Sequence, residues 1–191
     1  MPAERIVLGE AELPGTVLRL PAIYGPGDYL HRLWPYLKRM DDGRPFIILP
    51  EGFAQWRWTR GYVENVAEAI ALAAAARTAG RVYNVGEPEA FSELEWAQKI
   101  AEAVGWCGRF MILPAERTPA HLGMHGNTAQ HWVASTDRIR NELGYREVVS
   151  PQESLRRTIE WERAHPPEPP LLPLDYAAED AAAAASTAAE A

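Results

Sequence analysis

The sequence has 191 residues, 47% of them hydrophobic, and a formal net charge of -7. This length and composition suit one domain with a hydrophobic core, or one domain followed by a tail. The acidic balance argues against non-specific nucleic-acid binding, no apolar run approaches the roughly 20 residues of a membrane span, and the start lacks the layout of a signal peptide. Cys107 is the single cysteine, which excludes an internal disulfide and favours a reducing, cytoplasmic location.

The first feature in chain order is a short apolar strand over 17–20 that ends in a cluster of chain-breaking residues. Pro21 has no backbone N–H to donate to a sheet, so we expect the strand to end there or to lie at an edge. The run Gly25-Pro26-Gly27-Asp28 then predicts a tight loop whose acid is well placed to cap the next helix. Because ligands bind at the carboxyl ends of strands in α/β proteins, this loop is the first candidate for a binding edge.

Predicted strands and helices alternate along the rest of the chain, as expected for an α/β fold. Strands are predicted over 46–49, 55–62, 81–86 and 110–114, and helices over 31–40, 63–76 and 138–143. The first of these helices tolerates Pro35 only if it starts near Leu33. Two capping boxes, Ser92-x-x-Glu95 and Ser150-x-x-Glu153, predict the starts of two further helices.

Residues 118–132 show no apolar repeat and predict a mobile loop, which we expect to cover a substrate pocket. This loop contains His121, His125 and His131, a set that could be read as a zinc site. Two glycines argue against a helix that would align the first two histidines, and no Cys or acid completes the set nearby, so no metal site is predicted.

The composition changes after His165. Residues 166–173 are rich in proline and residues 177–191 are rich in alanine and acids, with no face to bury. We therefore assign 1–165 to one domain and expect the tail, 166–191, to be disordered.

The segment from Leu18 to Asp28 closely resembles the Arg-x-x-x-x-Tyr-Gly-Pro-Gly segment of extended short-chain dehydrogenases/reductases, the NAD-dependent epimerase/dehydratase family. Later landmarks of that family follow in order: Val63-Glu64-Asn65-Val66-Ala67, Tyr83-Asn84-Val85-Gly86, and Leu143-Gly144-Tyr145. The resemblance covers about Glu4 to Pro166. It implies an α/β fold, the C-terminal part of a Rossmann-like extended short-chain dehydrogenase/reductase without the N-terminal dinucleotide-binding βαβ units.

The resemblance also implies a cofactor and site residues. In the family this strand ends beside the nicotinamide, and the following loop opens the substrate pocket. NAD or NADP is therefore the implied cofactor, with Pro21, Ala22 and Ile23 beside it. A small-molecule substrate would be contacted by Tyr24, His31, Arg32, Arg57 and Arg60.

One position departs from the family pattern. Many nucleotide-sugar enzymes have an arginine five residues before the valine that is Val63 here, and this chain has Trp58. Arg60 would lie on the same face of a strand as Trp58 and could substitute. The departure puts a nucleotide-diphosphate substrate in doubt.

The catalytic Tyr-x-x-x-Lys of the family is not found, because none of the seven tyrosines is followed by a lysine four positions on. The Gly-rich run that cradles a pyrophosphate is also missing. By the resemblance the catalytic pair belongs upstream of Met1, so no catalytic residue is assigned. We expect a fragment of an NAD(P)-dependent epimerase, dehydratase or reductase, inactive alone, whose family acts on nucleotide sugars or small carbonyl or hydroxyl compounds.

Two alternatives stay open. In the first alternative, the chain is a non-catalytic binding or scaffold module that retains the substrate lobe. In the second, it is a metal-dependent enzyme that uses the histidine loop. Without the missing strands, the chain would expose apolar surface. We therefore expect either a partner chain carrying the missing half or self-association, and neither nucleic acid nor a membrane as partner.

Overall fold

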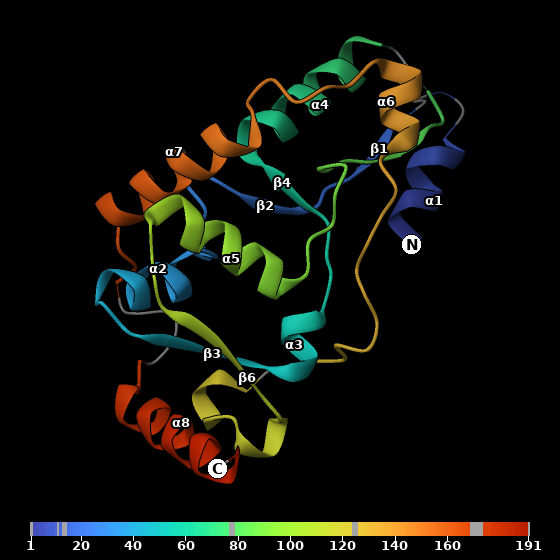
Figure 1. Ribbon diagram of the computed structural model, residues 1–191. Helices are drawn as coiled ribbons and strands as arrows, with labels where there is room; N and C mark the ends of the chain where they lie inside the picture. The colour runs from blue at the N-terminus through green and yellow to red at the C-terminus, as the bar shows by residue number, and fades with distance from the viewer. Residues whose placement is uncertain are drawn as a thin grey trace.

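The computed structural model describes residues 2–10, 12, 15–76, 79–123, 126–168 and 174–190. Figure 1 shows an α/β arrangement in which helices lie around short strands. In these ranges the strands form three two-stranded parallel ladders. They are β1 (Val17–Arg19) with β5 (Val82–Asn84), β2 (Ala22–Tyr24) with β4 (Arg60–Tyr62), and β3 (Phe46–Pro50) with β6 (Arg109–Leu113).

The predicted opening strand is interrupted at Leu20 and Pro21 and then resumes as β2. Pro21 cannot donate to a ladder, and at this point the chain exchanges β5 for β4 as its hydrogen-bonded neighbour. The backbones approach closely here, since a Cβ at Gly61 would lie 2.7 Å from Cγ of Pro21. The strand therefore ends at the predicted place, but the run of strand residues continues to Tyr24.

The remaining elements follow the predicted order, apart from the helices α3 and α8, which the sequence did not predict. The helices are α1 (Pro2–Gly9), α2 (Trp34–Asp41), α3 (Glu51–Gln55), α4 (Val63–Ala75), α5 (Glu93–Val104), α6 (Asp137–Leu143), α7 (Pro151–Ala164) and α8 (Tyr176–Glu190), with 3-10 turns η1 (Ala115–Arg117) and η2 (Ala120–Leu122). The strand predicted over 55–62 is wrong for its first part. Residues 51–55 form α3, and Arg57 and Trp58 make only isolated bridges before β4 begins.

Helix ends follow the local sequence signals. The capping box at Ser92 is confirmed, and α5 ends at Gly105 in the left-handed region, with φ of 68°. Helix α2 has Pro35 in its first turn, as predicted. Asp28 does not cap α2; its carboxylate accepts from the N–H groups of Leu30 and Arg32 in the preceding turn, at 3.1 and 3.2 Å.

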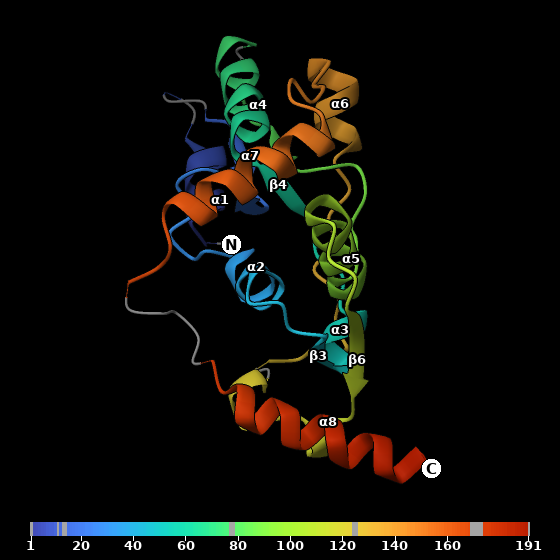
Figure 2. The ribbon, with the colours of Figure 1, turned by 60° about the vertical axis from the view of Figure 1, so that its left-hand side comes forward.

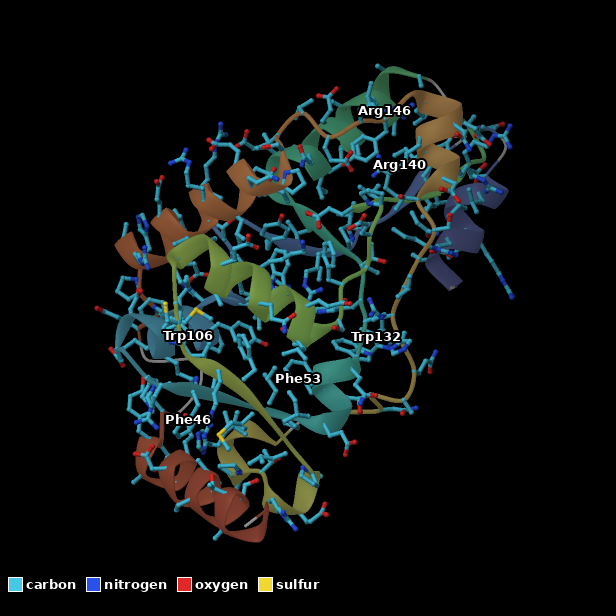
Figure 3. The ribbon with its side chains drawn as sticks, viewed as in Figure 1. Phe46, Phe53, Trp106, Trp132, Arg140 and Arg146 are labelled. Atoms are coloured by element: carbon cyan, nitrogen blue, oxygen red, sulfur yellow. The ribbon has the colours of Figure 1, made fainter. Side chains whose placement is uncertain are left out.

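Three clusters of buried side chains hold these elements together. The largest packs α2, α5 and α7 against one face of β3, with Leu37, Ile47, Ile100 and Ile159 among its members. The second lies between α4, α6 and β5. The third lies between the other face of the β3–β6 ladder and α8, where Phe46 points toward the helix (Figure 3).

Helix α8 differs from the disordered tail expected over 166–191. It crosses the β3–β6 end of the molecule, as Figure 2 shows. Its Glu179 is fully buried and accepts hydrogen bonds from Nε and Nη2 of Arg39, at 3.2 and 2.6 Å, while Nε2 of His121 lies 3.0 Å away. The helix thus has a face to bury, built from small residues and one acid, with Ala183 and Ser186 also buried.

Within the described ranges, no helix is both long and apolar enough to cross a membrane.

Replacing Glu179 with alanine is expected to lower the free energy of unfolding by about 3–5 kcal/mol, because Arg39 would be left as an unpaired buried charge. The two side chains are 0% and 3% exposed. Asp180→Ala is the matched control on α8, since Asp180 pairs with Arg44 but is 56% exposed; its cost should stay below about 1 kcal/mol. Urea denaturation followed by circular dichroism measures both, and equal losses would contradict burial as the cause.

Candidate functional site

Two cavities meet strand β2 at its two ends. Cavity A, of about 680 Å³, contains Tyr24 from the end of β2 and is also lined by Glu87, Phe91, Trp96, Lys99 and Gln152. Cavity B, of about 560 Å³, contains Ala22 from the start of β2 and is also lined by Pro21, Trp58, Asn84, Trp132 and Ser135. The structure therefore divides the predicted wall residues, with Pro21 and Ala22 in cavity B and Tyr24 in cavity A.

Cavity A is organised by a buried phenol–carboxyl pair. The Tyr24 hydroxyl donates to Oε1 of Glu87 at 2.7 Å, and its ring meets Trp96 edge-on with centroids 5.0 Å apart. Burial raises the pKa of Tyr24 far above its ordinary value. Burial also raises the pKa of Glu87, although the hydrogen bond from Tyr24 and the charge of Arg60 oppose it. Tyr24 consequently acts as a fixed hydrogen-bond donor.

Arg60 is buried in an aromatic and acidic environment. Its guanidinium lies 4.9 Å from the ring centroids of both Trp58 and Trp96, and its Nη2 donates to Oε2 of Glu93 at 2.5 Å. Burial lowers the pKa of Arg60, and the charge of Glu93 opposes that shift. Arg60 does lie on the same side as Trp58, as predicted, but its donors serve protein groups.

Glu93 holds Arg60 and Trp58 in place, and sequence reasoning did not single it out. Its Oε2 also accepts from the Trp58 indole N–H at 2.9 Å, and its Oε1 accepts from the Tyr36 hydroxyl at 2.6 Å. Its place in the Ser92 capping box showed that it starts a helix, but no local signal indicated that a carboxylate there is 4% exposed. Its partners come from α2 and from the segment around β4.

Arg57 points to a different partner. Its Nη1 and Nη2 donate to the two carboxylate oxygens of Glu95 at 2.8 and 3.0 Å, and this pairing lowers the pKa of Glu95 to about 2. Both side chains are 42% exposed. Arg57 lines neither cavity.

His31 and Arg32 lie in the turn before α2 and also line neither cavity. His31 has a positive φ of 47°, and its Nδ1 lies 2.7 Å from Oε2 of the fully buried Glu162. Arg32 pairs with Asp28 and donates to the backbone oxygen of Ile23 at 2.7 Å. These groups tie the loop after β2 to α7.

One side of cavity B is lined by residues 132–135, which begin at the last residue of the loop predicted over 118–132. Trp132 bridges to Trp58 in a parallel arrangement, with Thr59 N–H donating to the Trp132 carbonyl at 3.0 Å. The Ala134 N–H donates to Thr59 Oγ1 at 2.9 Å. Figure 3 shows Trp132 on the connection that runs from α6 toward α3. The C-terminal end of the predicted loop thus lines a cavity at β2.

The histidines of this loop have separate neighbours. His121 faces Glu179, and Nδ1 of His131 accepts from the Arg57 backbone N–H at 3.2 Å. His125 lies outside the described residues. Among the residues that the structure does describe, no group of three His, Cys, Asp or Glu side chains is placed to hold a metal ion.

A complete dinucleotide site does not fit the residues of this chain. A pyrophosphate cradle needs a glycine-rich turn that leads into a helix N-terminus, and the 191 residues contain no such run. The Ser92 start of α5 satisfies its own N–H groups through the capping box. What the chain offers toward a nicotinamide is the wall formed by Pro21 and Ala22.

Comparison with known proteins gives a consistent match. The model of the NAD dependent epimerase/dehydratase family matches residues 3–86. The Bordetella bronchiseptica enzyme WbmF, solved in complex with NADH, superposes with a TM-score of 0.62 at 26% identity, over 84% of this chain and 50% of that one. Residues 3–86 thus resemble the NAD-dependent epimerase/dehydratase family. The α/β structure of the chain matches the Rossmann-like fold of this family over part of its length.

Two curated relatives show how much of a known protein the chain covers. A dTDP-glucose 4,6-dehydratase of Streptomyces niveus is 29% identical over 78% of this chain and 41% of its own length. A 3beta-hydroxysteroid-dehydrogenase/decarboxylase isoform 2 of Arabidopsis thaliana is 29% identical over 75% of this chain and 30% of its own length. The chain thus spans less than half of each, and the family cofactor is NAD or NADP.

The pH dependence of stability tests the Tyr24–Glu87 pair. Because the pKa of Glu87 is raised above 4.5 in the folded state, folding is favoured by its protonation, and stability falls as pH rises from about 4.5 through the raised value. Glu87→Gln should lack this fall, so its free energy of unfolding should improve relative to the parent between about pH 4 and pH 7. Tyr24→Phe removes the hydroxyl that lowers the pKa of Glu87. The pKa of Glu87 should then rise further, and the loss of stability with rising pH should become larger.

Urea denaturation across this pH range measures both variants. A difference between Glu87→Gln and the parent that does not change with pH would contradict the assignment.

Proposed function

We propose that this chain forms the substrate-facing half of an NAD(P)-dependent epimerase, dehydratase or reductase. Its substrate is a nucleotide sugar or a small carbonyl or hydroxyl compound. The proton-transferring Tyr-x-x-x-Lys and the glycine-rich turn are supplied by residues outside this chain. By itself the chain holds the substrate side of the site and carries out no hydride transfer.

The observation that carries this proposal is the position of cavity B. Cavity B is lined by Arg19 and Leu20 at the end of β1 and by Asn84 and Val85 at the end of β5. These are the carboxyl ends of two parallel strands, the edge at which open α/β sheets bind ligands. A dinucleotide approaching this edge would meet Pro21 and Ala22 first.

The roles of the other predicted residues follow from their neighbours. We propose that Ile23 supports the cofactor wall through its backbone, which holds Arg32, and that Tyr24 acts at cavity A. His31 and Arg32 would shape the loop rather than touch substrate. Arg57 and Arg60 would serve substrate binding indirectly, because their guanidinium groups are held by Glu95 and Glu93.

A second candidate function is a non-catalytic binding module. The sequence supports it because the Tyr-x-x-x-Lys and glycine-rich motifs are both missing while both cavities are well formed. In either case cavity B has an apolar rim. Leu20, Trp132 and Val133 are 47%, 64% and 54% exposed, and such a rim favours either a chain that carries the missing half or self-association.

A chimera separates the two functions. We expect this chain alone to leave NADH fluorescence unchanged, because it has no pyrophosphate cradle. Joining the N-terminal part of the Streptomyces niveus dehydratase ahead of Met1 should restore NADH binding and, with a family substrate, produce the absorbance of a reduced nicotinamide. The same chimera with its tyrosine and lysine replaced is the control. Tight NADH binding by the chain alone, or a folded chimera that binds NADH yet reduces no cofactor with any substrate, would reject the enzymatic proposal.

A further inference from the structure

Three tryptophans form one wall of cavity B and the layer behind it. Trp58 and Trp132 line the cavity. Trp56 lies behind them, stacked on Trp58 with centroids 5.0 Å apart and edge-on to Trp132 at 5.1 Å. The Trp56 indole N–H donates to the Gln130 carbonyl at 2.8 Å, which fixes this layer.

The orientation of Trp58 is fixed from the protein side. Its indole N–H is used by Glu93 at 2.9 Å, and the guanidinium of Arg60 lies 4.9 Å from its ring centroid. Trp56 also stacks on this ring, so protein groups use both the polar atom and the ring surface of Trp58. Trp132, which is 64% exposed, is the tryptophan that offers its ring surface to the cavity. This wall of cavity B is therefore formed by aromatic rings.

Cavity B offers little to an anion. Arg19 is the one charged residue in its lining within the described chain, and its Nε and Nη2 both donate to Glu4 at 2.9 Å. The arginines nearest to the tryptophan wall, Arg57 and Arg60, are held by Glu95 and Glu93. A diphosphate entering this cavity would have to break one of these pairs to gain a counter-charge.

Apart from Arg19, the polar side chains that line the cavity are neutral. The Asn84 side chain donates its Nδ2–H to the Ser135 carbonyl at 3.0 Å, which leaves its oxygen as an acceptor that has no partner in the described part of the chain. Leu20, Val85 and Val133 contribute apolar side chains to the lining. A volume of about 560 Å³ lies within the range of ordinary small-ligand pockets.

From this geometry we infer that cavity B binds an uncharged ligand through a flat aromatic ring, placed against Trp132, with a polar group directed to Asn84. The inference rests on the proposed function, because it names the substrate class of the same site. Among the proposed substrate classes, it selects an aryl carbonyl or hydroxyl compound and excludes recognition through a diphosphate.

Calorimetric titration of the full chain with 2-acetylnaphthalene, UDP and uridine tests this inference. We expect 2-acetylnaphthalene to bind tightest, and UDP to bind no better than uridine, since the diphosphate gains no free cation. UDP binding about tenfold or more tighter than uridine would overturn the inference, as would the absence of 2-acetylnaphthalene binding.

Variants locate the binding. Trp132 is 64% exposed, so replacing it should leave the chain folded. Trp132→Ala should weaken 2-acetylnaphthalene binding about fivefold or more, and Trp132→Phe should retain it, because a ring remains. Trp161→Ala is the control; that tryptophan stacks on His31 and His165, outside the cavity. Equal weakening by the Trp132 and Trp161 variants would also overturn the inference.

The two proposals fail separately. A chimera without hydride transfer whose parent chain still binds 2-acetylnaphthalene through Trp132 would reject the enzyme and leave the cavity assignment intact. An active chimera whose parent chain binds UDP about tenfold or more tighter than uridine would support the enzyme and reject the cavity assignment.

Discussion

The buried carboxylate of Glu93 is the interaction on which the region between the two cavities depends. It accepts from Arg60, Trp58 and Tyr36, at 2.5, 2.9 and 2.6 Å. A buried carboxylate is costly unless its oxygens are fully used, and here charge-assisted and neutral donors occupy both. The result connects the first turn of α5 with α2 and with β4. It also fixes the Trp58 ring that forms the wall of cavity B.

A second buried carboxylate has the same role at the opposite end of the molecule. Glu179 of α8 reaches Arg39 of α2 and His121 of η2, so one helix of the C-terminal segment is held by two elements distant in sequence. The face of the β3–β6 ladder that carries Phe46 and Ile48 is covered in this way. Both cases place one acid from a helix against an arginine that is itself nearly buried.

Local signals account for what the sequence could predict. The start of α5 at Ser92 and the ends of α5 and α6 at Gly105 and Gly144 depend on residues within one helical turn. The rule that ligands bind at the carboxyl ends of strands marked the loop after Pro21 as a candidate binding edge, and in the structure Pro21 and Ala22 line cavity B.

Helix α8 and the carboxylate partners of Arg57 and Arg60 were not predicted for one physical reason, which is that the stabilising partners are far away in sequence. Helix α8 has a weak pattern of its own, and it is ordered through Arg39, which no local rule connects to Glu179. Arg57 and Arg60 were expected to face substrate because an arginine on a strand can reach a phosphate. Their carboxylate partners lie on α5, more than one element away. The orientation of each arginine is therefore set by the carboxylate that the tertiary structure places beside it.

Each two-stranded ladder needs support beyond its own hydrogen bonds, because an isolated pair of strands is marginally stable in water. The support consists of buried polar residues that each hold a loop against an element. Asn65 of α4 is one example: its Nδ2 donates to the Val149 carbonyl at 3.0 Å, while its Oδ1 accepts from the N–H groups of Val148 and Val149 at 3.0 and 2.9 Å. Arg140 of α6 is another, donating to the Gly86 carbonyl after β5 at 2.9 Å.

These contacts act at the ends of β4 and β5, the strands that pair with β2 and β1. They keep the carboxyl edge in position although each ladder has only two strands in the described residues. The carboxyl edge beside cavity B is therefore organised by contacts within this chain. The apolar rim of cavity B, which those contacts do not cover, is the surface that remains for a ligand and for the other half of the site.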